Sequence, residues 1–216
     1  MQITPRHLPG LYETPCQMAG CFVQYRKNLP LQKMNQEGRF MLERFYPDIY
    51  ISSTYQIDFQ SYYDSGYRGI IFDIDNTLVT HGAPADTRSV ELINKLKNIG
   101  FEILLLSNNK EPRVKMFNDA VSVKYIFKAG KPASKGYRKA MELLGTDTDT
   151  TLFVGDQLFT DVWGARNTGI FSILVQPIDK KEEIQIVLKR YLEKLVLFFY
   201  KRKCKKEGKE YLLKQG

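Results

Sequence analysis

Short apolar runs alternate with amphipathic stretches between residues 67 and 175, a pattern typical of a parallel sheet with helices on both faces. The expected strands are β-prone runs at Gly69–Asp73, Glu102–Leu106, Tyr125–Lys128, Thr151–Val154 and Ser172–Val175. Helical spacing predicts helices between them, at Thr87–Asn98, from about Pro112, at Ser134–Leu144, and from a cap at Thr160 or Asp161 to Asn167. We therefore predict an α/β fold with a doubly wound parallel sheet.

The rest of the chain divides into an N-terminal and a C-terminal part. Residues 1–40 mix prolines and glycines without a sustained period, so we expect a weakly ordered extension. The aromatic-rich segment Phe45–Ser65 is expected to pack against the edge of the sheet. We predict an extension at 1–40, the α/β domain at 41–178, and an amphipathic helix with a basic tail at 179–216.

The C-terminal helix is expected to carry one apolar face. That face comprises Ile184, Val187, Leu188, Tyr191, Leu192, Leu195, Phe198 and Phe199. Opposite it lie Lys189, Arg190, Glu193 and Lys194, together with the apolar Ile186 and Leu197. A basic amphipathic helix followed by the cluster Lys201–Lys206 suits attachment to an anionic lipid surface. The same stripe also suits a helix that covers the sheet, and both alternatives stay open.

Composition and charge narrow the class of protein. The chain has 216 residues, 43% of them hydrophobic and 26% charged, which fits one globular core with tails. No apolar run approaches the roughly 20 residues that span a bilayer, and we expect no secretory signal. Three cysteines are too few for a disulfide framework, so we expect a cytoplasmic protein. The net charge of +8 is concentrated in the last sixteen residues, so we expect no nucleic-acid-binding face.

Two aspartates, Asp73 and Asp75, follow the apolar run of the first expected strand. Side chains two positions apart point the same way in a strand, so these carboxylates would lie side by side. Two like charges this close favour a cation between them. The pair suits a metal-assisted phosphoryl transfer, in which one carboxylate attacks phosphorus and the other handles the proton. The alternative is a strand that simply ends in an Asp-Asn turn.

Polar residues also follow the other expected strands, and parallel strands end at one shared edge. These residues are Ser107-Asn108-Asn109, Lys131-Pro132 and Gly155-Asp156-Gln157 with Asp161. A hydroxyl, an amide and a lysine suit a phosphate dianion, and acidic residues from two strands suit Mg²⁺. Taken singly, Ser107 fits an ordinary loop, Lys131 a solvated lysine and Asp161 a helix N-cap. Their order along the chain favours one common site.

Together these segments resemble the four motifs of the haloacid dehalogenase (HAD) superfamily of phosphatases. The similarity is strongest to the subfamily IIIA group that includes phosphatidylglycerophosphate phosphatases. The segments are Asp73–Leu78, Ser107–Asn109, Lys131-Pro132 and Gly155–Asp161. The stretches between the motifs hold only one loop, one helix and one strand each, so they leave no room for a cap domain. An uncapped site suits phosphates on large partners or at a membrane surface.

The resemblance implies a role for each catalytic residue. Asp73 would be the nucleophile and form an aspartyl-phosphate, while Asp75 would protonate the leaving alcohol and then activate water. Ser107 and Asn108 would bind phosphate oxygens. Lys131 would also contact the phosphate and offset its negative charge.

The same resemblance implies a magnesium site. Mg²⁺ would be held by Asp73, by the backbone carbonyl of Asp75 and by Asp156. Asp161 would support the site through water or Lys131.

We therefore predict a Mg²⁺-dependent phosphomonoester hydrolase whose substrate is a phosphorylated molecule such as phosphatidylglycerophosphate, on the inner face of a membrane. One alternative is a cytosolic phosphatase of soluble phosphomonoesters or phosphoproteins. Another is a non-catalytic binding protein on the same fold, because fold alone does not define function. The sequence assigns no oligomeric state.

Overall fold

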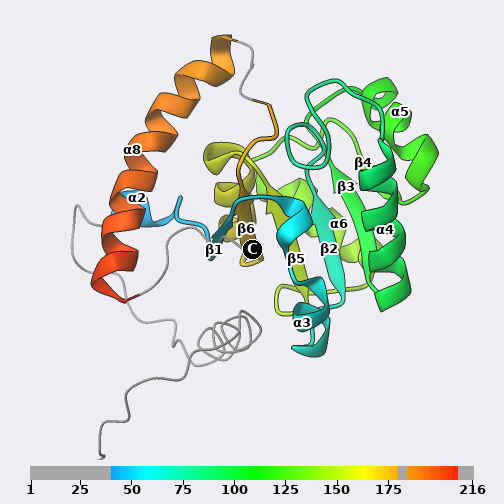
Figure 1. Cartoon of the computed structure of the whole chain (residues 1–216), viewed down its shortest axis with the longest axis horizontal. Coiled ribbons are helices and arrows are strands. Elements are labelled where there is room, and N and C mark those ends of the chain that lie inside the picture. The colour runs from blue at the N-terminus through cyan, green and yellow to red at the C-terminus, as the bar shows by residue number, and fades with distance from the viewer. Residues whose placement is uncertain (1–39, 180–183, 209–216) are drawn as a thin grey trace, which may run out of the picture.

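Six parallel strands form a single sheet in the order β1-β6-β5-β2-β3-β4 (Figure 1). The strands are β1 (Ile49–Ile51), β2 (Gly69–Phe72), β3 (Glu102–Leu106), β4 (Lys124–Ile126), β5 (Thr151–Gly155) and β6 (Phe171–Val175). This computed structural model describes residues 40–179 and 184–208 and confirms the expected α/β fold. The predicted extension at 1–40 lies, apart from its last residue, outside the described part of the chain.

The central strands are buried on both faces, which is why they are almost continuously apolar. In β2, Ile70 and Phe72 contribute to one core cluster, whereas Ile71 contributes to a second cluster on the opposite face. The strand order reverses between β2 and β5, which are paired with Ile71 opposite Phe153. Such a switch point opens a crevice beyond the carboxyl ends of the strands.

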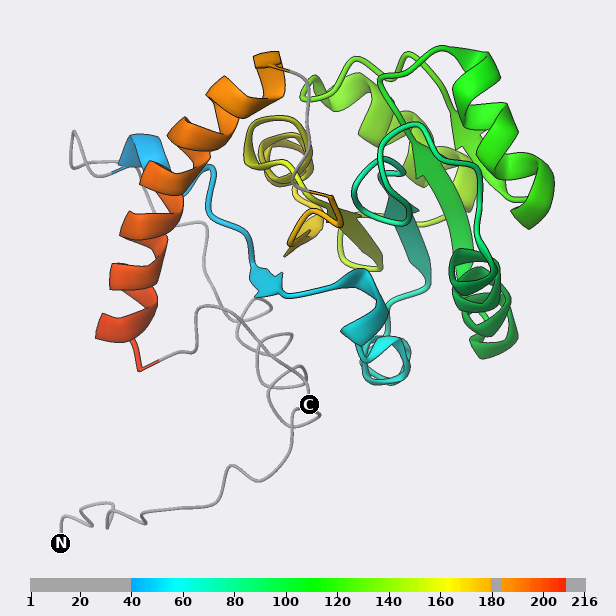
Figure 2. The same ribbon diagram turned by 45° about the horizontal axis from the view of Figure 1, so that its top comes forward.

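Helices cover both faces of the sheet (Figures 1 and 2). The first layer contains α3 (Phe59–Asp64), α4 (Thr87–Ile99) and α5 (Glu111–Val121). The second contains α6 (Ser134–Leu144) and α7 (Trp163–Thr168). The expected helices therefore match those observed to within a few residues, with Gly100 and Gly145 in the left-handed conformation at the ends of α4 and α6.

The segment Phe45–Ser65 contributes a strand to the sheet edge. β1 pairs with β6, with Ile49 opposite Ile173, and is followed by the 3₁₀ turn η1 (Thr54–Gln56) and α3. A strand of three residues is too short to produce a recognisable alternation of polar and apolar positions. The sequence therefore indicated packing at this edge without locating the strand.

The connection after β5 differs from the predicted helix start. A π-helical turn, η2 (Leu158–Val162), precedes α7, and neither Thr160 nor Asp161 is the N-cap of a helix. The carboxylate of Asp161 instead accepts a hydrogen bond from Gln157 N at 3.1 Å and forms an ion pair with Lys131. The N-cap alternative for Asp161 is therefore wrong.

The C-terminal helix α8 (Ile184–Lys206) lies beside α2 (Phe40–Glu43) along the β6 side of the molecule (Figures 1 and 2). Lys203 Nζ pairs with Glu43 Oε1 at 3.0 Å. Among the side chains of α8 that the structure describes, from Lys189 onward, the buried ones are Glu193, Val196, Tyr200 and Cys204. Val196 packs on Leu158 and Val162 of η2.

The side of α8 that faces the protein is not the apolar stripe expected from the sequence. The described members of that stripe are exposed: Tyr191 by 64%, Leu192 by 56%, Leu195 by 53%, Phe198 by 52% and Phe199 by 40%. We call these five residues the outer face of α8. The alternative in which this stripe covers the sheet is wrong for them, and the side chains of Ile184, Val187 and Leu188 lie outside the described set. Glu193, predicted on the polar side opposite that stripe, is buried.

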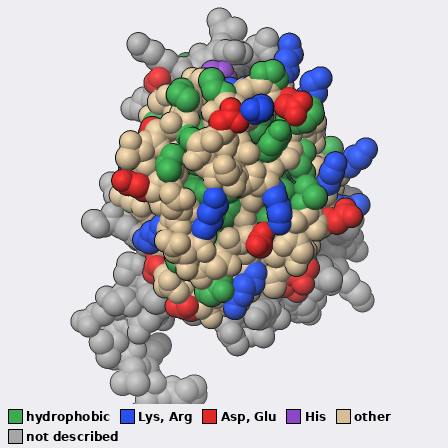
Figure 3. Space-filling model, turned by 90° about the vertical axis from the view of Figure 1, so that its right-hand side faces the viewer, with side chains coloured by type: hydrophobic (Ala, Val, Ile, Leu, Met, Phe, Trp, Pro, Cys, Tyr) green, Lys and Arg blue, Asp and Glu red, His purple; other side chains and the backbone are tan. Residues whose placement is uncertain are grey.

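The surface carrying α4 and α5 shows acidic and basic side chains interspersed, without a concentrated basic patch (Figure 3). Within the described residues, no helix combines the length and the apolarity needed to cross a bilayer.

Candidate active site

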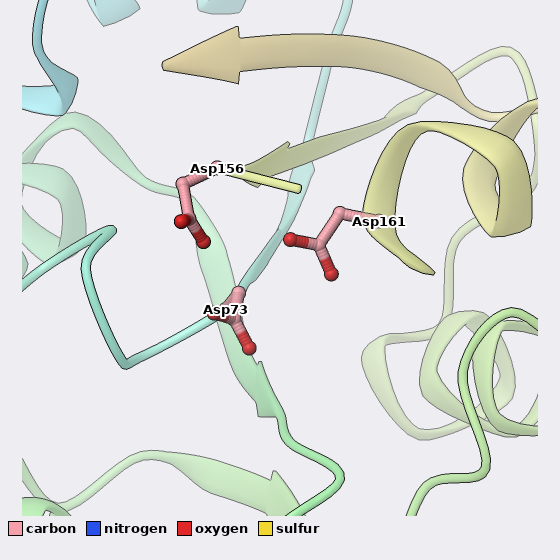
Figure 4. A group of neighbouring side chains, drawn as sticks. All are labelled: Asp73, Asp156 and Asp161. Atoms are coloured by element: carbon pink, nitrogen blue, oxygen red, sulfur yellow. The ribbon is translucent and has the colours of Figure 1, made fainter. Parts of the chain in front are cut away.

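Three carboxylates converge at the switch point of the sheet. Asp73 directly follows β2, Asp156 directly follows β5, and Asp161 lies on η2 (Figure 4). One oxygen from each lies within 4.8 Å of the others, and all three residues are buried. They meet because β2 and β5 are neighbours in the sheet although they are far apart in the sequence.

Lys131 joins this cluster from the loop after β4. Its Nζ lies 2.5 Å from Asp73 Oδ1 and 2.7 Å from Asp161 Oδ1, and only 4% of its side chain is exposed. Burial alone lowers the pKa of this amine, but the charges of Asp161 and Asp73 raise it above its ordinary value. Lys131 is therefore a buried, protonated group, and the solvated-lysine alternative is wrong.

The acidic residues carry a large desolvation cost. Burial raises the pKa of Asp73, Lys131 opposes this shift, and Asp161 adds to it. Burial likewise raises the pKa of Asp156, against the opposing effect of Arg190. A cation at their meeting point would stabilise both carboxylates in the charged form.

The donor set fits a divalent cation by type and by charge. Carboxylate oxygens are hard ligands of the kind that Mg²⁺ prefers. Four buried carboxylates lie in and beside the cluster, namely Asp73, Asp156, Asp161 and Glu193, and two cations pair with them, Lys131 and Arg190. The two negative charges that remain are the charge that a divalent ion would balance.

Gly155 allows this cluster to form. A Cβ atom at this position would lie 2.5 Å from Asp161 Oδ2, closer than real Cβ contacts permit. Because Asp161 is fixed by Lys131 and by Gln157 N, it has little freedom to move away. The glycine before Asp156 is therefore a packing requirement of the site.

Asp75 lies close to Asp73 but has different partners. Its Oδ1 accepts hydrogen bonds from Gly82 N at 2.8 Å and from Arg113 Nη2 at 2.8 Å, and its Oδ2 accepts from Asn109 Nδ2 at 2.7 Å. Both aspartates follow the end of β2, so the strand geometry expected for the pair does not apply to them. The Asp75 side chain is held at the rim of the cluster, 12% exposed.

Ser107 and Asn108 follow β3 and border the same site. Ser107 is buried, and its Oγ accepts a hydrogen bond from Asn109 N at 3.1 Å. The Asn108 side chain accepts from Lys131 N at 2.7 Å and donates to Lys131 O at 3.0 Å. Asn108 thus fixes the backbone that carries Lys131, while its contact with a phosphate stays a prediction.

The structure adds three site residues that the motif pattern did not identify. Arg113 on α5 pairs with Asp75, and Arg190 on α8 pairs with Asp156 and with Glu193. Arg113 lies four positions after the motif residue Asn109, on a helix that the sequence predicted. Its direction toward the site depends on tertiary packing. For Arg190 and Glu193, the sequence signal is a pair of opposite charges three positions apart in an amphipathic helix.

Comparison with known proteins identifies the family. A family model described as HAD-hydrolase-like matches residues 128–184. The Bacillus subtilis (strain 168) protein named "Probable phosphatase YqeG" is 33% identical over 165 residues, covering 76% of this chain and 96% of that protein. The chain belongs to the HAD superfamily of phosphatases.

Two further similarities are more distant. The Arabidopsis thaliana protein named "Phosphatidylglycerophosphate phosphatase 1, chloroplastic/mitochondrial" is 26% identical over 174 residues, covering 74% of this chain but 48% of that protein. The solved structure of a cobalt-bound deoxy-D-mannose-octulosonate 8-phosphate phosphatase from Haemophilus influenzae has 14% sequence identity and a TM-score of 0.43. It covers 51% of this chain and 68% of that one.

The HAD fold of this chain has no cap domain within its described residues. Only α4 separates β2 from β3, and only α5 separates β3 from β4. The edge of the sheet that carries Asp73 and Ser107 is therefore not covered by an inserted domain, as the spacing of the motifs predicted.

Proposed function

We propose that the protein is a Mg²⁺-dependent phosphomonoester phosphatase that uses Asp73 as its nucleophile. The observation that carries this proposal is the buried Asp73 carboxylate, held 2.5 Å from Lys131 Nζ beside two further carboxylates at the switch point of the sheet. This arrangement offers a nucleophile, a compensating cation and a metal-binding set in one place.

The positions of the side chains support a reaction in two steps. An Asp73 oxygen attacks phosphorus and forms the aspartyl-phosphate as the bond from phosphorus to the leaving alcohol breaks. Asp75 donates the proton that the alcohol oxygen takes up, and the resulting carboxylate then removes a proton from the water that attacks the aspartyl-phosphate. That water releases inorganic phosphate and restores the Asp73 carboxylate. Arg113 and Asn109 keep the Asp75 side chain beside the site.

The remaining groups stabilise charge. Lys131 offsets the negative charge shared by Asp73 and the phosphoryl group, and Ser107 Oγ donates to a phosphate oxygen. Asp73, Asp156 and the backbone carbonyl of Asp75 would hold Mg²⁺, with Asp161 fixed behind them by Lys131. The bound ion would supply a Lewis acid that neutralises charge on the phosphoryl oxygens.

For the substrate, we propose a phosphomonoester in a lipid headgroup at an anionic membrane, such as phosphatidylglycerophosphate. The uncapped site supports it, because a site that is not enclosed can act on a phosphate that remains in a bilayer. The outer face of α8 supports it as well, since five exposed apolar side chains are followed by the exposed bases Lys201, Lys205 and Lys206. The name of the Arabidopsis relative is consistent with this substrate.

A panel of phosphate esters tests both parts of the proposal. The full chain is assayed for phosphate release from phosphatidylglycerophosphate in anionic vesicles, p-nitrophenyl phosphate, glycerol 3-phosphate and a phosphopeptide, with Mg²⁺ or with EDTA. We expect Mg²⁺-dependent release that is fastest on the lipid. A protein with Asp73→Asn, purified in parallel, controls for contaminating phosphatases.

The outcomes separate the alternatives. Faster release from soluble esters than from the lipid would favour a phosphatase of soluble phosphomonoesters or phosphoproteins. Release that persists in EDTA would contradict the metal requirement. No release from any ester would favour a binding protein on the same fold.

A further inference from the structure

The helix α8 reaches the metal-binding carboxylates through one side chain. Arg190 Nη1 donates to the backbone oxygen of Asp156 at 2.7 Å, and Arg190 Nη2 donates to Asp156 Oδ2. The Arg190 side chain is 16% exposed and the Asp156 side chain is 0% exposed. A single guanidinium thus binds both the backbone and the carboxylate of the same aspartate, a geometry that the planar fork of arginine permits.

Arg190 is itself held by Glu193, one helical turn further along α8. Arg190 Nη1 donates to Glu193 Oε2 at 2.8 Å, and Glu193 Oε1 accepts from Leu158 N at 2.8 Å. Leu158 opens η2, the turn that also carries Asp161. Glu193 therefore connects the helix, the guanidinium and the turn beneath the acidic cluster, and Val196 adds an apolar contact on the same side.

The bonds to Asp156 limit the positions that its carboxylate can take. Oδ2 is bound by Arg190, and Oδ1 accepts from Thr77 Oγ1 at 3.3 Å. Rotation about the side-chain bonds of Asp156 would break both contacts of a side chain that is 0% exposed. A ligand carboxylate held in this way is already oriented when a metal arrives, so binding requires little further ordering.

A purely structural explanation of Arg190 is that it neutralises the buried Glu193. That explanation accounts for the bond to Glu193 but not for the two bonds to Asp156. Of these two, one goes to the backbone oxygen of Asp156 and one to its carboxylate. The contacts with Asp156 therefore need a reason of their own.

We propose that Arg190 is a positioning residue for Asp156, and that α8 thereby completes the divalent-metal site of this protein. The inference rests on the proposed function in that it assigns Asp156 as a metal ligand. It adds that a helix outside the α/β sheet and outside the motifs fixes the orientation of that ligand.

Loss of the positive charge of Arg190 and loss of the fixed orientation of Asp156 would change the Mg²⁺ affinity in opposite directions, which makes the proposal testable. Arg190→Met removes a positive charge next to the acidic cluster, so a purely electrostatic effect would make Mg²⁺ bind more tightly. Loss of the fixed carboxylate orientation would make it bind more weakly, by about 10- to 100-fold, as is typical when the partners of metal ligands are removed. We expect the weaker binding.

Isothermal titration of the full chain with Mg²⁺ alone measures this effect without reference to activity. The matched control is Lys189→Gln, which removes the same charge from the exposed neighbour on α8 and should bind Mg²⁺ like the unaltered protein. Arg190→Lys keeps the charge but lacks the fork, so we expect it to recover only part of the affinity. Unchanged or tighter Mg²⁺ binding by Arg190→Met would overturn the proposal.

A double variant tests the explanation that Arg190 only neutralises the buried Glu193. Arg190→Met leaves Glu193 as an unpaired buried carboxylate, which alone could destabilise the fold. Adding Glu193→Gln removes that charge and keeps an oxygen that can accept from Leu158 N. If Arg190 positions Asp156, the folded double variant still binds Mg²⁺ weakly; recovery of full affinity would assign Arg190 to neutralisation of Glu193 and overturn the proposal.

Activity measurements distinguish failure of this inference from failure of the proposed function. If the unaltered protein hydrolyses phosphate esters with Mg²⁺ and the Arg190 variants keep its Mg²⁺ affinity, only the positioning role fails. If it hydrolyses none of the esters yet binds Mg²⁺ more tightly than Arg190→Met does, the positioning role stands and the phosphatase proposal fails. An unaltered protein that binds no Mg²⁺ would overturn both.

Discussion

Burial of the Asp73 carboxylate lowers the stability of the fold, whereas its role as nucleophile serves catalysis. Substitution of Asp73 separates these two effects. Asp73→Asn should abolish turnover because an amide does not attack phosphorus, and it should leave the melting temperature unchanged or higher because a buried charge is removed. Phosphate release and thermal unfolding measure these effects. Trapping with beryllofluoride should mark Asp73 in the unaltered protein only.

Asp119→Asn is the control for Asp73→Asn, because Asp119 is an exposed aspartate on α5 that pairs with Lys115. It should keep full turnover. Normal activity in the Asp73→Asn protein would instead eliminate Asp73 as the nucleophile.

Two lysines of one loop differ in burial and therefore in expected effect. Lys131 is bound to Asp73 and Asp161, whereas Lys128 is exposed. Lys131→Ala should lower kcat by about 10²- to 10³-fold, the usual cost of removing a group that stabilises developing charge. Lys128→Ala should leave kcat close to that of the unaltered protein. Equal losses in the two variants would show that the charge of the loop matters and not the position of Lys131.

At this scale, local spacing predicted the acidic cluster and its lysine but not their partners. Asp73 and Asp156 each follow an apolar run directly, so the ends of buried strands locate them. Arg113 and Arg190 lie on helices, where the sequence indicates which residues share a face but not which face meets the site. Their roles depend on packing between distant elements, which a motif does not encode.

At the scale of elements, the sequence of α8 likewise does not show which face of the helix packs on the protein. Both sides of this helix carry apolar residues, and the continuous stripe expected to mark its contact with a surface or the sheet includes the five exposed side chains. The side that faces the protein instead contains Val196, Tyr200 and Cys204 together with Glu193, a mixed set that periodicity does not distinguish. The strands and helices of the sheet were easier to predict because burial on both faces and glycine at the helix ends leave clear signals.

The outer face of α8 supports a prediction about membranes. Replacing Lys201, Lys205 and Lys206 by Gln should weaken binding to anionic vesicles by roughly 3 kcal/mol, since each base near the surface contributes about 1 kcal/mol. Leu195→Ser with Phe198→Ser should weaken it further by reducing the apolar area. Co-sedimentation with vesicles at low and high ionic strength measures both effects, and the lysine effect should shrink at high salt.

These point variants keep the buried Val196, Tyr200 and Cys204 and the Lys203–Glu43 pair, whereas deletion of residues 201–216 would remove Cys204 and that pair. Leu143→Ser, which alters an exposed leucine on α6, is the matched control and should bind vesicles normally. If all the variants bind equally well, α8 is not the membrane-binding surface. Activity on p-nitrophenyl phosphate should stay constant throughout.

At the scale of the whole molecule, stability and metal binding are coupled through one buried cluster. Burial raises the pKa of Asp73 and of Asp156, so keeping these carboxylates charged without a metal ion costs free energy in the folded state. Mg²⁺ binds the folded state with its assembled carboxylates and not the unfolded chain, so it should raise the melting temperature in proportion to the logarithm of its concentration above Kd. EDTA should reverse the increase.

Asp156→Asn tests whether the cluster causes this response. It removes one ligand charge and should raise the melting temperature of the metal-free protein while reducing the further increase that Mg²⁺ produces. Asp147→Asn, a substitution of an exposed aspartate that lies outside the cluster, should leave the Mg²⁺ response intact. The measurement is thermal unfolding followed by circular dichroism across a Mg²⁺ series. A Mg²⁺ response of equal size in Asp156→Asn and in the unaltered protein would place the ion elsewhere, and the acidic cluster would then have to be explained by Lys131 and Arg190 alone.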